Sequence, residues 1–413
     1  MALSKQYKDL QFYKFCGYGF LKNLKFFEAF FILFLIEKGL SFTQIALLYS
    51  LREILIYITE IPTGLIADAL GRKKTMVWSF AFYIISFFIF YLSNSLFLLV
   101  FAIVFFAFGD SFRTGTHKAM IFEYLKIKSW QKLKVDYYGE TRSCSQLGSA
   151  LSSIIAAAIV FINKNYDVIF LVSAIPYFLD MLLIISYPAY LDGNKVPLQF
   201  KAVLKAFKKI INELVISLKQ PDKLKILFNV SSFSGYFKQT KDYLQYIIQS
   251  LAISVPLLYG ITQKQQTAVF IGFAFFILYL LTSRASKYSG KANKSFANKE
   301  KALNGLLFFG LTAGLLGGLF FHFSLYILSI LFFVLIYLLE NFRKPIGIAY
   351  ISENFSSDSL ATTLSVESLT KTLLASFFAL MLGFFADVFD VGIALSLVSV
   401  LVLFIGFIFR LKN

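Results

Sequence analysis

The feature that most constrains this chain is a succession of apolar segments, most of them about 20 residues long. A helix of ~20 apolar residues spans the ~30 Å hydrocarbon core of a bilayer. The first set of segments lies near residues 15–37, 42–63, 75–94, 96–119, 139–162 and 166–188. The second set lies near residues 224–250, 251–262 with 266–283, 302–321, 323–344, 361–386 and 391–410. We interpret residues 254–260 as the outer end of the seventh helix and a loop. The pattern then predicts an all-α membrane protein of twelve transmembrane helices.

Composition and charge agree with a membrane location. Of the 413 residues, 58% are hydrophobic, which is too many for a soluble globular domain. The net charge of +17 would suggest a nucleic-acid partner in a soluble protein. Here the basic residues occupy alternate loops, namely the N-terminus, 72–74, 118–134, 195–225, 284–301, 343–344 and the C-terminus. The positive-inside rule therefore predicts two cytoplasmic termini and no nucleic-acid binding.

The connection between the two sets of segments is amphipathic. Val203, Phe207, Ile210, Ile211 and Leu214 share one face of a helix over residues 200–219. Such a helix lies in a membrane interface, although a partner-binding helix is an alternative. We therefore predict a six-helix bundle over 1–190, a cytoplasmic linker over 191–223 and a second bundle over 224–413.

An internal repeat relates the two bundles. Asp110-Ser-Phe-Arg113 is followed by Ala119, Ile121 and Glu123, and Glu340-Asn-Phe-Arg343 is followed by Ala349, Ile351 and Glu353, each pair offset by 230 residues. The two stretches end the fourth and tenth segments, which are equivalent positions in a 6+6 arrangement. The repeat predicts two pseudo-symmetric halves.

A short motif joins the second and third segments, Gly64-Leu-Ile-Ala-Asp68-Ala-Leu-Gly71-Arg72-Lys-Lys74. A chance basic turn is the alternative reading. The motif resembles the loop 2–3 signature of the major facilitator superfamily, Gly-x-Leu-x-Asp-x-x-Gly-Arg-Lys. The resemblance implies a transporter that works by alternating access, with a cytoplasmic gate in which Arg72 bonds Glu123 with help from Arg142. The implied gate residues are Gly64, Asp68, Gly71, Arg72, Glu123, Arg142 and Glu353.

Ionisable residues inside the predicted segments must face a wet cavity or one another, since each costs about 2.5–3.5 kcal/mol at the bilayer centre. They lie mainly in the first, second, fourth, seventh, tenth and eleventh segments. Asp180 in the sixth segment departs from this pattern, and we interpret it as a helix contact. Balanced ion pairs that hold the halves together are the alternative, above all for Asp110–Arg113 and Glu340–Arg343.

Cations on the first and seventh segments indicate an anion site. The predicted substrate-binding residues are Lys22, Lys25, Arg113, Lys238, Lys241, Gln245 and Arg343. Acids beside these cations are candidates for proton coupling, namely Glu28, Glu53, Asp110 and Glu340. The pairing of Glu28 with Arg113 resembles the helix 1 acid and helix 4 arginine of proton-coupled sugar porters.

We therefore expect a secondary transporter of a small organic anion or zwitterion, coupled to protons, with sodium as the alternative ion. It would be a monomer in a bacterial cytoplasmic membrane. A proton-driven multidrug exporter is the alternative, although the fifth segment lacks the Gly-Pro element typical of drug antiporters. No nucleophile motif, nucleotide loop or metal-ligand spacing indicates an enzyme, a cofactor or a metal site.

Overall fold

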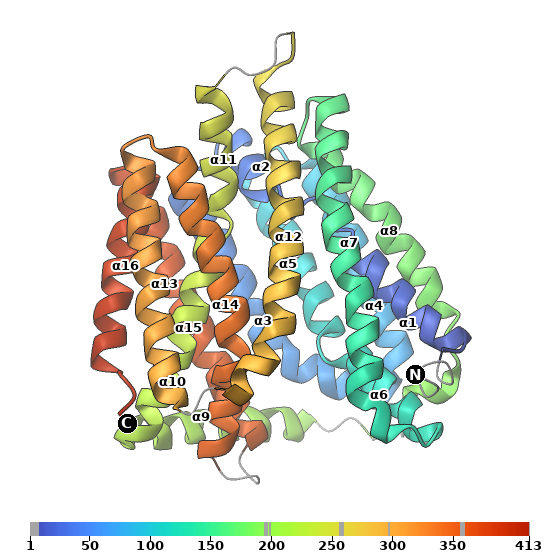
Figure 1. Cartoon of the computed structure of the whole chain (residues 1–413). Helices are drawn as coiled ribbons and strands as arrows, with labels where there is room; N and C mark the ends of the chain where they lie inside the picture. Colours follow the sequence, from blue (N-terminus) through green and yellow to red (C-terminus); the bar gives the residue numbers. More distant parts are fainter. Residues whose placement is uncertain are drawn as a thin grey trace. The chain divides into compact units, whose positions relative to one another are not determined.

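The computed structural model describes residues 8–193, 197, 200–255, 260–295, 298–355 and 360–412. Within these residues, regular secondary structure is helical throughout (Figure 1). Residues 256–259, within the predicted loop after the seventh helix, lie outside the described residues.

Nine helical stretches among the described residues are long and apolar enough to cross a membrane. They lie in α4 (Arg72–Leu92), α5 with α6 (Leu96–Arg113 and Thr116–Ile127), α7 (Lys134–Asn163), α8 (Asp167–Ile185), α12 (Gln263–Ser295), α13 (Lys299–His322), α14 (Tyr326–Asn354), α15 (Leu360–Val388) and α16 (Val391–Ile408). The remaining predicted segments correspond to α1 with α2, α3 (Phe42–Leu70), and α10 with α11. The twelve segments of the sequence are thus found as helices, some of them interrupted.

The first predicted segment, 15–37, is not one continuous helix. It forms α1 (Leu10–Lys22) and α2 (Phe31–Glu37), joined by tight turns in which Glu28 N–H donates to the Lys25 carbonyl at 3.0 Å. At the start of the break, the Asn23 amide donates to the Gly19 carbonyl at 2.6 Å. A side chain that bonds to backbone in this way competes with the helical ladder. The hydropathy of the segment does not reveal this break in the helix.

The seventh segment, 224–250, is also divided. It forms α10 (Pro221–Thr240) and α11 (Tyr243–Ser254), which meet at Lys241 and Asp242. Both helices that carry the predicted lysines are therefore interrupted where those lysines lie.

The two copies of the internal repeat differ in backbone. The helix of the first copy breaks at Gly115, which has a φ of +77° between α5 and α6. The second copy has Pro345 at the equivalent position, and α14 continues through it. Glycine adopts positive φ readily, whereas proline cannot.

The described residues form two units. Unit 1 comprises the residues as far as Phe30, Leu55–Val203 and Ile271–Tyr279. Within it, α4 packs against α5 and α8, and α1 packs against α7 and α8. Unit 2 comprises Phe31–Ile54, Leu204–Phe270 and the residues from Leu280 onward. The division into bundles at residues 190 and 224 stays a prediction.

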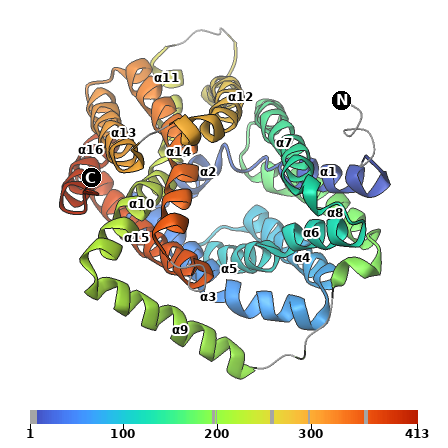
Figure 2. The same cartoon turned by 60° about the horizontal axis from the view of Figure 1, so that its bottom comes forward.

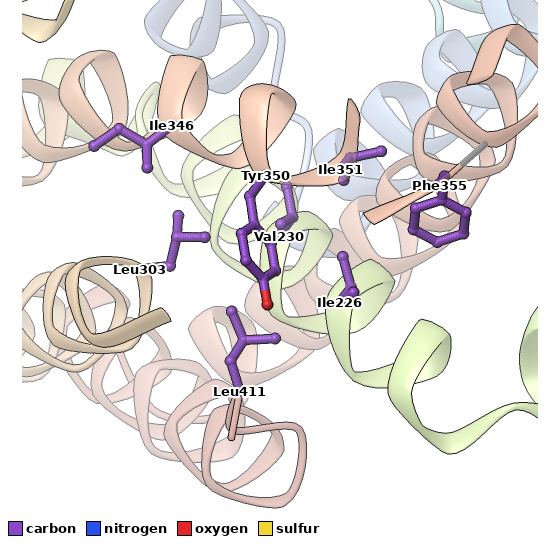
Figure 3. Packing of buried hydrophobic residues seen from close by; sticks show 8 residues of the cluster. All are labelled: Ile226, Val230, Leu303, Ile346, Tyr350, Ile351, Phe355 and Leu411. Atoms are coloured by element: carbon purple, nitrogen blue, oxygen red, sulfur yellow. The ribbon is translucent and has the colours of Figure 1, made fainter. Parts of the chain in front are cut away.

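In unit 2, α13 packs against α14 and α16, and α10 packs against α15. Small residues allow the close approach, because a Cβ on Gly318 would lie only 2.6 Å from the Gly392 carbonyl oxygen. One part of the apolar core gathers side chains from α10, α13, α14 and the C-terminal tail, among them Ile226, Leu303, Ile346 and Leu411 (Figure 3).

The amphipathic connection is α9 (Phe200–Lys219), which confirms the predicted helix. Its course turns sharply where α10 begins at Pro221 (Figure 2). Proline at the first position of a helix costs no hydrogen bond, because that N–H has no helical partner in any case. Placement of α9 in a lipid interface stays a prediction.

Candidate functional site

Unit 1 contains a cavity of about 210 Å³ between α1, α5, α6 and α7. Four cationic side chains line it, Lys22, Arg113, Lys118 and Arg142. The other lining residues are neutral or aromatic, and none of the described lining residues is Asp or Glu. The electrostatic character of this cavity is therefore positive. Two of the predicted substrate-binding residues, Lys22 and Arg113, meet here.

Arg113 is held by an acid and a tyrosine. Its Nη2 lies 2.7 Å from the Asp110 carboxylate, and its Nε donates to the Tyr83 hydroxyl at 3.1 Å. Tyr83 in turn donates to Asp110. Gly109 makes room for this tyrosine, since a Cβ there would lie 2.8 Å from the Tyr83 ring. Asp110 and Tyr83 orient the guanidinium at the cavity wall, and the Asp110–Arg113 ion pair is the one that the ion-pair alternative expects.

Lys22 is the last residue of α1 and also lines the cavity. It forms no ion pair or hydrogen bond with any residue that the structure describes, although Arg113, Lys25 and Asp110 act on it electrostatically. The break after α1 places this cation at the C-terminal end of a helix, where the helix dipole favours positive charge. Lys22 is thus a half-buried cation available to an anion.

Aromatic side chains shape the wall around these cations. His117 is buried and stacks on Tyr18, with ring centroids 3.5 Å apart. Its Nε2 lies 3.2 Å from the Tyr187 hydroxyl, and Phe15 meets its ring edge-on. His117 lines the cavity, and its contacts fix the position of α6 against α1.

Two exposed cations border the cavity on α6 and α7. Lys118 lies over the Tyr138 ring at 5.5 Å, and Arg142 is exposed on the facing helix. The resemblance assigned Arg142 to the gate, whereas the structure places it in the wall of this cavity. Both charges can attract an anion toward Lys22 and Arg113.

The predicted acid partner of Arg113 has another contact. Glu28 lies 3.6 Å from Lys25 in the turns that follow α1. Its proposed pairing with Arg113 stays a prediction, as does the role of Lys25 in substrate binding.

In unit 2, the predicted acid Glu53 is buried and forms ion pairs with Lys238 and with Arg52, the latter at 3.2 Å. Arg52 also lies over the Tyr49 ring at 5.0 Å. These charges of α3 and α10 are thus paired with one another, as the ion-pair alternative expects. Mutual neutralisation lowers the cost of burying them.

The two other predicted residues of the seventh segment have local partners. Lys241 lies 3.2 Å from the Asp242 carboxylate, at the junction of α10 and α11. The Gln245 side chain is fully buried and accepts a hydrogen bond from the Ile32 N–H at 3.1 Å. Gln245 thereby caps an unpaired donor at the start of α2.

Arg343 is among the most buried side chains, with 1% of its surface exposed. Its Nη2 donates to the carbonyl and to the side-chain oxygen of Asn229, both at 2.8 Å. Weaker bonds reach the carbonyls of Val230 at 3.3 Å and Leu303 at 3.4 Å. This side chain joins α10, α13 and α14 inside unit 2, which is the geometry of a structural anchor.

Glu340 forms no ion pair with Arg343 in this structure, so the ion-pair alternative does not hold for these two residues. Its Oε1 accepts from the Ser234 hydroxyl at 2.8 Å, and its Oε2 has no hydrogen-bond partner among the described residues. The guanidinium is instead drawn to Asn229, which the local sequence could not show because the partner is 114 residues away.

The loop 2–3 motif is mostly helical. α3 continues to Leu70 and α4 begins at Arg72, so Gly71 alone interrupts the helices, with a φ of +105°. The Asp192 carboxylate accepts from the Lys73 N–H at 2.7 Å and occupies the start of α4. An acid there is favourable because the first N–H groups of a helix lack partners.

Of the predicted gate residues, Arg72 lies 3.7 Å from Asp68, on the same motif. Glu123 lies 4.0 Å from Lys126, and Glu353 pairs with Lys299. Arg72 and Glu123 therefore have other partners in this structure than the resemblance implies. The gate stays a prediction.

Several residues that shape the site escaped the sequence reasoning. Tyr83 and Asp192 are single polar residues without a motif, and Lys118 belongs to a basic stretch that orientation alone explains. No pattern within the sequence signals their partners, because each contact joins distant segments.

Comparison with known proteins places this architecture in a family. The sequence profile of the Major Facilitator Superfamily matches residues 23–379. An uncharacterized MFS-type transporter of Bacillus subtilis (strain 168), YxaM, is 34% identical over 90 residues, which is 22% of this chain and 23% of that protein.

Solved structures agree in fold at low sequence identity. A mutant of the nucleoside transporter NupG has a TM-score of 0.73 at 12% identity, covering 96% of this chain and 98% of its own. A mutant of the peptide transporter POT in complex with alafosfalin has a TM-score of 0.73 at 14% identity, covering 97% and 93%. At this identity the likeness concerns the fold and carries no substrate. The chain belongs to the Major Facilitator Superfamily and is a membrane transporter.

Proposed function

We propose that this protein is a secondary active transporter of a small organic anion or zwitterion. The observation that carries the proposal is the cavity of unit 1, in which Lys22, Arg113, Lys118 and Arg142 meet without an acid among the described lining residues. Within the part of the chain that the structure describes, Arg113 alone of these four has an acid bonded to it, and that acid contacts one nitrogen of the guanidinium. Carboxylates and phosphates are the groups that such cations bind most strongly.

Proton coupling is part of the proposal. Moving an anion across a membrane against the potential costs energy. A proton that crosses with the anion carries a compensating positive charge. Asp110, which is bonded to the lining residue Arg113, is an acid beside this cavity and supports such coupling. The transport unit is proposed to be a single chain in a bacterial cytoplasmic membrane, with both termini cytoplasmic as the basic loops indicate.

A binding screen tests the substrate class. The purified protein in detergent is heated with organic anions, zwitterions or lipophilic cations at two pH values, because a ligand that binds only the folded state raises its melting temperature. We expect stabilisation by anions or zwitterions. Stabilisation by lipophilic cations alone would contradict the proposal and favour the multidrug exporter.

Variants connect the result to the cavity. Lys22→Gln removes a charge-assisted contact of about 1.5–3 kcal/mol and should weaken anion binding at least about tenfold. Lys208→Gln removes an exposed charge on α9 and serves as the matched control. Equal affinities of the two variants would show that the anion binds elsewhere.

A further inference from the structure

One acid in unit 1 has surroundings unlike those of the predicted coupling acids. Asp180 lies on α8 and is 0% exposed. Neither of its carboxylate oxygens accepts a hydrogen bond from any described residue. By contrast, Asp110 and Glu53 are held by cations in direct ion pairs. Asp180 is therefore a buried carboxyl group that the rest of the structure does not bond.

Two cations of the cavity wall act on Asp180. Lys22 and Arg113 are the cations that act on it electrostatically, and neither bonds it directly. The titratable groups facing this region are Tyr18 and Lys22 on α1, Tyr83 on α4, Arg113 on α5, Tyr177 on α8 itself and Tyr187 beyond it. The described residues of α7 contribute none to it.

Elementary electrostatics limits the state of this carboxyl. An ionised carboxylate without a partner is very costly in an apolar interior, whereas the neutral acid costs much less. Arg113 donates to Asp110 and Tyr83, and it makes no bond to Asp180. Lys22 has no bonded partner among the described residues, and its flexible side chain ends at the cavity. An ionised Asp180 would thus compete for Lys22.

We propose that Asp180 is the proton-binding carboxyl of this transporter and that Lys22 is shared between Asp180 and the transported anion. When Asp180 holds a proton, the Lys22 ammonium is available to the anion in the cavity. When the proton passes to water, the Asp180 carboxylate takes the ammonium and the anion loses a contact. Proton and anion then bind together and leave together. This inference rests on the proposed function and deepens it by naming the coupling group.

Infrared spectroscopy of the purified protein tests the proton directly and needs no substrate. A neutral carboxyl has a carbonyl stretch that a carboxylate lacks. We expect such a band at neutral pH, shifted by incorporation of ¹³C-aspartate into the unaltered protein and absent from Asp180→Asn. Glu340→Gln, which alters the other buried acid with an unbonded oxygen, should leave this band in place. A spectrum without an aspartate carbonyl band would overturn the proposal.

The role of Lys22 is tested by titrating the same band. Lys22→Gln removes the cation that would stabilise the Asp180 carboxylate. The pH at which half of the carbonyl band is lost should therefore rise by at least about one unit, which is a tenfold gain in proton affinity. Lys118→Gln is the matched control, since this cavity lysine does not act on Asp180. An unchanged midpoint in Lys22→Gln would overturn the proposal that Lys22 is shared between Asp180 and the anion. A band that never titrates while the protein stays folded would overturn it as well. The infrared titration is done without an anion. A negative binding screen would therefore count against the proposed substrate class and would not affect the result of the titration.

Discussion

Replacement of Arg343 by methionine separates two roles for this residue. The sequence predicts an anion-binding arginine, whereas the structure shows a guanidinium bonded to Asn229 inside unit 2. If the structure describes its role, Arg343→Met should reduce stability and leave anion affinity unchanged. Methionine has a similar length and removes the buried charge without leaving a large void.

The magnitude follows from the contacts. The two bonds at 2.8 Å involve a charged donor and contribute about 1.5–3 kcal/mol each, or about 3–6 kcal/mol together. Removal of the charge also removes its desolvation cost, which offsets part of this loss. We expect a net destabilisation of about 2–4 kcal/mol, which lowers the folding equilibrium constant by between about one and three orders of magnitude.

The assay follows helical circular dichroism of the purified protein during titration with a denaturing detergent. Lys344→Met, which alters the exposed neighbouring cation, is the control and should change stability by less than about 0.5 kcal/mol. Binding of the anion found in the screen is then measured on the folded variant. A stability equal to that of the unaltered protein, together with a tenfold loss of anion affinity, would refute the anchor role.

Further variants test the packing and the charges. Glu53→Gln should destabilise the protein by less than the ~3–5 kcal/mol typical of a fully buried pair, because the Lys238 side chain that loses its acid is only half-buried. Glu53→Gln with Lys238→Met should recover most of that loss in the same titration. Gly71→Ala should cost about 1–3 kcal/mol because its φ is +105°, whereas Gly64→Ala, with open space around its Cβ, should be neutral or stabilising. Equal effects of the two glycine changes would contradict the observed backbone. Gly272→Leu should lower the melting temperature by steric conflict with α7.

The sequence alone was sufficient for the fold class and the family. Hydrophobic runs of membrane length predict helices whatever their partners, since unpaired backbone groups are prohibitive in lipid. The motif from Gly64 to Lys74 indicated the family, and it could be read from the sequence because its residues are neighbours in the chain. The amphipathic pattern of α9 was likewise local, and its helix was predicted with the observed bounds.

Only the tertiary structure decided which charges meet. Arg113 forms an ion pair with Asp110, three residues away. Arg343 forms no ion pair with the equivalent acid, Glu340, and donates to Asn229 instead. Asp180 gave no signal beyond being an acid in an apolar segment, and its lack of a bonded partner emerges from the packing of α8 against α1 and α4. The physical reason is the range of the interactions. Helix formation depends on adjacent residues, but the partner of a buried charge is set by segments that are distant in sequence.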